Sequence, residues 1–212
     1  MFSLQTIFGK GDKFYGLLEQ SAEAARDSAR ALHELVSQPD RAPVMANFTA
    51  ARAREKALAS QISEELVNTF VTALDREDIE ALNSALYKIP KTIEKFAERY
   101  VLVADRLTGI DFAQRAQLLE RSAAVVVEMI GELRRGLKID PVKKLQDRLQ
   151  ALEAEGDRML LSPYRTLYVE ATNTQDTIRA VLAKDLFELV EKAIDKCRDV
   201  GNVVYSIVLK NS

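Results

Sequence analysis

Apolar residues recur at intervals of three and four along most of the chain, which is the spacing of one face of an α-helix. In the stretch that follows Asp140 the series is Val142, Leu145, Leu149, Leu152, Met159, Leu160 and Leu167. No segment alternates between apolar and polar residues for long enough to predict a β-strand. The pattern therefore predicts an all-α fold.

Breaks in this pattern divide the chain into six predicted helices. Pro and Gly residues interrupt it at "SQPDRAP" (37–43), at "TGID" near 108 and at "GLKIDP" near 136, where helices are expected to end. The predicted helices cover roughly 12–36, 43–74, 76–106, 111–136, 140–172 and 175–210, and "IFGKGDKF" is interpreted as a flexible lead into the first. Short loops between long helices favour antiparallel neighbours. One medium helix followed by two long ones, twice over, predicts two tandem three-helix bundles, 1–108 and 109–212, in an elongated molecule.

Composition and charge narrow the classes of function. The chain is 47% hydrophobic and 29% charged, as in ordinary globular proteins. A net charge of -2 without a basic run argues against nucleic acid as a partner. The single Cys cannot form an internal disulfide, which suits the cytoplasm. No signal peptide is recognised, and no apolar stretch reaches the ~20 residues of a membrane span, so we expect membrane contact only through a partner.

The residues that most enzymes need are scarce. His33 is the only histidine, which removes the usual base for Ser or Cys nucleophiles. There is no P-loop and no Gly-rich turn between a strand and a helix. A metal-dependent hydrolase would need an open coordination position and a positioned acid or base, and we find no candidate for the latter. The sequence therefore predicts a protein that is not an enzyme.

Two pairs of acidic residues have the same spacing on the last two predicted helices. Glu153 and Asp157 are four residues apart, and so are Glu191 and Asp195. Like charges at this spacing share a helix face and repel, and the four carboxylates could converge if the two helices are antiparallel neighbours. Oxygen-only clusters suit Mg, Ca or Mn, and also iron or zinc when carboxylates bridge them. The alternative is a solvated seam in which the acids pair with nearby cations, namely Arg158, Lys192 and Lys196.

Four stretches resemble the PhoU-like proteins, specifically the branch of accessory proteins associated with a low-affinity inorganic phosphate transporter (Pit). They are "KGDKFYGLLEQSAEAARDSARALHELV", "LVNTFVTALDREDIEALN", "LEAEGDRML" and "LVEKAIDKCRDVGNVVYSIVLK". The second is the most specific. The resemblance implies two tandem three-helix bundles and, in the second, an iron or zinc site at Glu153, Asp157, Glu191 and Asp195.

The first half of the chain departs from the family's metal motif. By the family's spacing, the four acidic positions fall at Arg52, Lys56, Tyr87 and Lys91, so all four expected ligands are absent and three have become cations. Cations cannot share a divalent metal site. One interpretation is that they pair with local acids such as Glu55 and Glu94, or extend to water. The other is that they attract phosphate or an acidic partner segment.

The resemblance implies a cytoplasmic regulator or accessory protein of inorganic phosphate transport. It would contact the transporter or its signalling partners, at the inner face of the membrane through that partner. The alternative is a helical adaptor with a vestigial metal site and no role in phosphate transport. We also expect a homo-oligomer, and the apolar stretch 122–130, "SAAVVVEMI", is either a surface for self-association or part of the core.

Overall fold

Long helices make up nearly all of the structure, a computed structural model that describes residues 4–38 and 45–211, without the side chains of 4–12 and 160–164. Within these ranges there is no strand. The helices are α1 (Leu4–Ser37), α2 (Ala46–Asn68), α3 (Arg76–Val103), the short 3-10 helix η1 (Ala104–Arg106), α4 (Ala113–Arg134), α5 (Ile139–Val169) and α6 (Thr174–Lys210). The all-α prediction is confirmed. The side chain of Leu160 and the predicted break at 39–43 lie outside the described residues.

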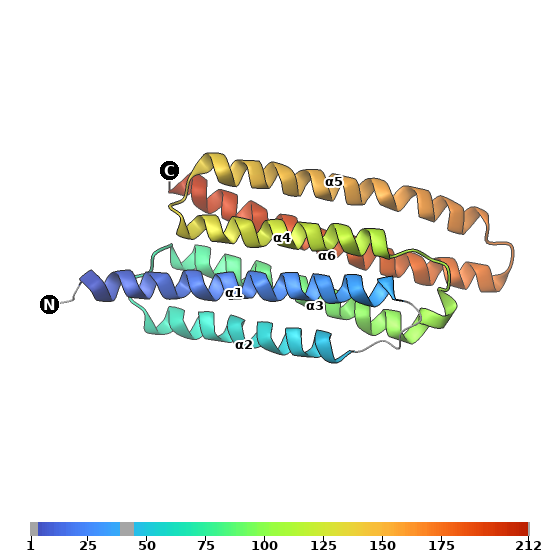
Figure 1. Cartoon of the computed structure of the whole chain (residues 1–212), viewed down its shortest axis with the longest axis horizontal. Helices are drawn as coiled ribbons and strands as arrows, with labels where there is room; N and C mark the ends of the chain where they lie inside the picture. The colour runs from blue at the N-terminus through green and yellow to red at the C-terminus, as the bar shows by residue number, and fades with distance from the viewer. Residues whose placement is uncertain (1–3, 39–44, 212) are drawn as a thin grey trace.

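The helices run along the long axis of the molecule as two units that lie side by side (Figure 1). The first unit is α1–α3 and the second is α4–α6. Across the boundary, α1 packs against α4 and α3 packs against α6. The predicted boundary at 108/109 falls in the connection between η1 and α4. The buried apolar side chains of both units belong to one continuous core, so each unit completes the other's hydrophobic surface.

The apolar face of each helix points into this core. On α6, Leu186, Val190, Ile194, Val204 and Val208 are all buried, as the periodicity predicts. Within 122–130 of α4, the larger apolar side chains are also buried, with the exception of a half-buried Val127. For that stretch the core interpretation is therefore the right one.

Ion pairs add polar contacts between the two units. Arg99 of α3 contacts Asp185 of α6 at 2.6 Å, and Arg134 of α4 contacts Glu19 of α1 at 3.0 Å. His33 Nδ1 lies 2.9 Å from a carboxylate oxygen of Glu120 on α4. These contacts give His33 a structural position between α1 and α4.

Two helix ends differ from the prediction. The backbone of α1 is helical from Leu4, so the flexible lead through "IFGKGDKF" is wrong: isolated glycines cost a helix only about 1 kcal/mol each and do not end it. α2 stops at Asn68 rather than near 74, and Thr69 is extended. The guanidinium of Arg76 donates to the carbonyl oxygens of Leu66 and Thr69, which satisfies acceptors that the end of α2 leaves free.

No helix in the described ranges combines the length and the apolar character needed to cross a bilayer.

Candidate functional site

The four predicted metal ligands lie along the seam between α5 and α6. These helices are antiparallel neighbours (Figure 1), so Glu153 and Asp157 of α5 come close to Glu191 and Asp195 of α6. Partial burial and then the charges of Asp195, Asp157, Glu188 and Glu153 raise the pKa of Glu191. The structure thus brings the four acids within electrostatic reach of one another.

Arg198, which was not predicted as a site residue from the sequence, also lies at this seam. The guanidinium of Arg198, one turn after Asp195, contacts Glu153 through Nη1 and Asp195 through Nη2, the second at 3.5 Å. Partial burial raises the pKa of the Asp195 carboxyl, and the charge of Arg198 opposes that shift. Two of the four acids therefore have an arginine partner inside the protein.

The donor set can be compared with what a metal ion needs. Carboxylate oxygens are suitable ligands for a hard cation. However, no group of three or more His, Cys, Asp or Glu side chains in the described residues is arranged to hold a metal. Asp157 is exposed, and Glu153 and Asp195 face Arg198. As arranged, the residues do not fit a metal ion, and metal binding at the seam stays a prediction.

An arginine, Arg52, also lies at the corresponding seam of the first unit, between α2 and α3. Arg52 is only 8% exposed, and its Nε lies 3.5 Å from a carboxylate oxygen of Glu94. Its guanidinium carbon lies 4.0 Å from the centre of the Tyr87 ring, which is a cation–π geometry. Arg52 therefore has the local acidic partner that the first interpretation of these cations expects.

Lys56 and Lys91, the other two cations of that seam, are exposed. Lys91 Nζ lies 5.8 Å from the Tyr87 ring centre. Because Arg52 is buried and paired, the three cations do not form a single open surface. An anion or a partner segment at this seam could reach Lys56 and Lys91 but would not reach most of Arg52.

A buried acid next to this seam was not singled out as a site residue from the sequence. Glu55, on α2, is fully buried, and its Oε1 accepts a hydrogen bond from Ser21 Oγ of α1 at 2.7 Å. Burial raises the pKa of Glu55, whereas the Ser21 hydrogen bond and the charges of Arg52 and Arg54 lower it. Its Oε2 has no hydrogen-bond partner. A charged residue on the core side of an amphipathic helix is the sequence signal that could have revealed it.

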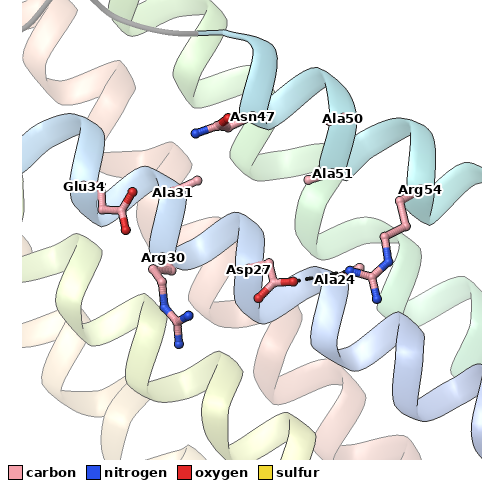
Figure 2. Close-up of a pocket in the computed structure, with 9 residues that line it drawn as sticks. All are labelled: Ala24, Asp27, Arg30, Ala31, Glu34, Asn47, Ala50, Ala51 and Arg54. Atoms are coloured by element: carbon pink, nitrogen blue, oxygen red, sulfur yellow. Dashed lines mark hydrogen bonds and ion pairs between the residues drawn. The ribbon is translucent and has the colours of Figure 1, made fainter.

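One hollow of the surface, of about 370 Å³, lies between α1 and the start of α2 (Figure 2). It is lined by Ala24, Asp27, Arg30, Ala31, Glu34, Asn47, Ala50, Ala51 and Arg54. The alanines leave room between the helices, and Asp27 pairs with Arg54 across the hollow at 3.4 Å. Its ionic groups are two acids and two arginines, so the hollow has no charge preference.

Comparison with known proteins found two proteins of similar sequence and a crystal structure of similar fold. No family model matches the chain. The UPF0111 protein YkaA of Bacillus subtilis (strain 168) is 22% identical over 154 residues, which cover 70% of this chain and 71% of that protein. A protein of Rhizobium meliloti (strain 1021) named "Putative pit accessory protein" is 22% identical over 220 aligned positions, covering 97% of this chain and 96% of that protein.

The crystal structure of a PhoU-like protein from Shewanella oneidensis MR-1 matches with a TM-score of 0.80, at 17% sequence identity, over 92% of this chain and 96% of that one. The chain thus has the fold of PhoU-like proteins. The predicted resemblance to the PhoU-like proteins is confirmed.

Proposed function

We propose that this chain is a non-enzymatic accessory protein that regulates inorganic phosphate transport. The observation that carries the proposal is the alignment with the Rhizobium meliloti protein, whose name refers to a pit accessory role and which matches along almost the whole of both chains. The PhoU-like fold of the Shewanella structure supports the same role. Mechanistically, the protein acts as a rigid helical platform, because its two units share one core.

The proposal has a cellular setting. The protein works in the cytoplasm, as a homo-oligomer, and reaches the inner face of the membrane through a phosphate transporter or a signalling partner of that transporter. It binds no nucleic acid.

The connection between α2 and α3 is our candidate for the partner contact. Phe70 and Val71 of the connection are exposed, Phe70 completely so at 101%, and so is Val67 in the last turn of α2. A contiguous patch of exposed apolar side chains is typical of a protein-interaction surface. The same connection belongs to the stretch that resembles the family most specifically.

Phosphate uptake by cells tests the proposal. Uptake of radioactive phosphate is compared in the parent strain, in a strain without the gene, and in that strain complemented with the wild-type gene or with Phe70→Ser. We expect a change in uptake on deletion, restored by the wild type and not by Phe70→Ser at equal protein level. Leu102→Ser is the matched control, because Leu102 is also exposed, at 82%, but lies at the opposite end of α3. Uptake that does not change on deletion would refute a role in phosphate transport.

A helical adaptor without a role in phosphate transport is the second candidate. The observation that favours it is the first unit, where Arg52, Lys56, Tyr87 and Lys91 stand at the family's acidic positions and Arg52 forms an internal pair with Glu94. For this candidate, purification of the tagged protein from cells would recover a partner while phosphate uptake stays the same on deletion.

A further inference from the structure

At the seam of each unit an arginine contacts a glutamate, but the helix that supplies the arginine differs between the two units. In the first unit, the second helix supplies an arginine, Arg52, and the third helix supplies a glutamate, Glu94. In the second unit, the second helix supplies a glutamate, Glu153, and the third helix supplies an arginine, Arg198. Each contact joins the second and third helices of its own unit.

The two contacts also occupy equivalent positions. By the spacing of the acidic motifs, Arg52 corresponds to Glu153 and Lys91 corresponds to Asp195. Glu94 follows Lys91 by the same three residues that separate Arg198 from Asp195. An ion pair therefore occurs at equivalent positions in the two units, with the arginine and the glutamate exchanged.

We propose that an arginine guanidinium takes the place of a metal ion at each of the two seams, Arg52 in the first unit and Arg198 in the second. Arg198 neutralises Glu153 and Asp195 and links α5 to α6. Arg52 links α2 to α3 through Glu94 and the face of Tyr87. This inference does not depend on the proposed role in phosphate transport.

The chemistry of the guanidinium supports this exchange. It is planar, always charged and able to donate to two carboxylates at once, which makes it the side chain best suited to paired acids. It also repels a divalent cation placed beside the same acids, since like charges a few ångströms apart destabilise each other strongly at a partly buried site. In the wild-type protein, Arg198 and a metal ion therefore compete for Glu153 and Asp195.

Removal of Arg198 should open the seam to metal. We would measure Mn²⁺ and Zn²⁺ binding by calorimetry, and thermal unfolding midpoints with and without each metal, for the wild type and for Arg198→Gln. We expect weak or no specific binding by the wild type and binding at least about tenfold tighter by Arg198→Gln. Metal should also raise the unfolding midpoint of the variant more than that of the wild type. Adding Asp157→Asn to Arg198→Gln should remove most of the gain.

Each outcome decides for or against the inference. Wild-type protein that binds one equivalent with micromolar affinity or better would overturn it. So would an Arg198→Gln protein that folds by circular dichroism but gains no affinity. If Arg198→Gln does not fold, Arg198→Lys replaces it: its ammonium keeps the charge, and we expect it to bind metal as weakly as the wild type, whereas tight binding by that variant would overturn the inference.

Discussion

Substituting Arg52 by glutamine removes one charge from the seam between α2 and α3 and keeps most of the side chain's volume. Arg52 has three interactions there: the contact with Glu94, the stacking over Tyr87, and an attraction to Glu55 that lowers the pKa of that buried carboxyl. Arg52→Gln leaves both carboxylates without this cation. The variant should therefore be less stable than the wild type.

The size of the loss follows from how buried the groups are. Removing one partner of a fully buried ion pair costs about 3–5 kcal/mol, and an exposed pair is worth about 0–1 kcal/mol. The side chain of Arg52 is 10% exposed and that of Glu94 is 25% exposed, so the pair is closer to the buried case. With the loss of the cation–π contact included, we expect about 2–3 kcal/mol. At a slope of about 2–3 kcal/mol per molar, the urea midpoint should fall by about 1 M.

The loss should also depend on pH. Burial raises the pKa of Glu55 in the folded protein above its ordinary value, so folding favours the protonated carboxyl relative to the unfolded chain. Stability linked to Glu55 is then fully present below its ordinary pKa and is lost as the pH rises through the raised pKa. Without Arg52 the pKa rises further, so Arg52→Gln should cost more at about pH 7 than at about pH 4.

Urea unfolding followed by circular dichroism at both pH values measures these effects. Lys56→Gln is the matched control, because Lys56 is an exposed cation on the same helix, and it should change stability by less than about 0.5 kcal/mol. The reasoning is refuted if Arg52→Gln unfolds at the same urea concentration as Lys56→Gln. An equal loss at both pH values would reject the link to Glu55.

Two further predictions concern the second unit. A Cβ atom on Gly201 would lie 2.5 Å from Leu149 Cδ1 and 2.6 Å from Gln146 Oε1. Gly201→Ala should therefore lower the thermal midpoint, because the cost of overpacking, about 1–3 kcal/mol, exceeds the gain in helix propensity. Gly131→Ala is its control: nothing lies within 4 Å of the new atom, so this variant should gain up to about 1 kcal/mol, and a gain at both positions would contradict the packing argument. Full burial raises the pKa of the Cys197 thiol. A thiol reagent such as DTNB should therefore react with it only as the protein unfolds. Rapid reaction of the native protein would contradict this prediction.

The helices could be predicted well because burial of one helix face leaves a direct record in the sequence. The apolar series of α6 is an example, since its members at Leu186, Val190 and Val204 are all in the core. The ends were less predictable. α2 ends at Asn68, and the side chain of Arg76 donates to carbonyl groups at that end. This contact depends on the path of a connection that periodicity does not describe.

The candidate site was predictable in part. The spacing of Glu153, Asp157, Glu191 and Asp195 correctly placed acids on facing helices. The cations considered as their partners were Arg158, Lys192 and Lys196, and Arg198 was not among them. Arg198 reaches Glu153 because of the register between α5 and α6, and register is a property of packing rather than of spacing along one helix. Aligning the two halves with each other, rather than only with a family pattern, would have revealed that Glu94 and Arg198 hold equivalent positions.

The arginine is on the second helix of the first unit and on the third helix of the second unit. This difference bears on which helices pair during folding. Both units have the same helix order, so the third helix of one unit competes for the second helix of the other. A misplaced pairing of α2 with α6 would set Arg52 against Arg198, and a pairing of α5 with α3 would set Glu153 against Glu94. Repulsion between like charges disfavours such wrong pairings. The two seams therefore favour pairing of α2 with α3 and of α5 with α6 over the crossed pairings within the chain.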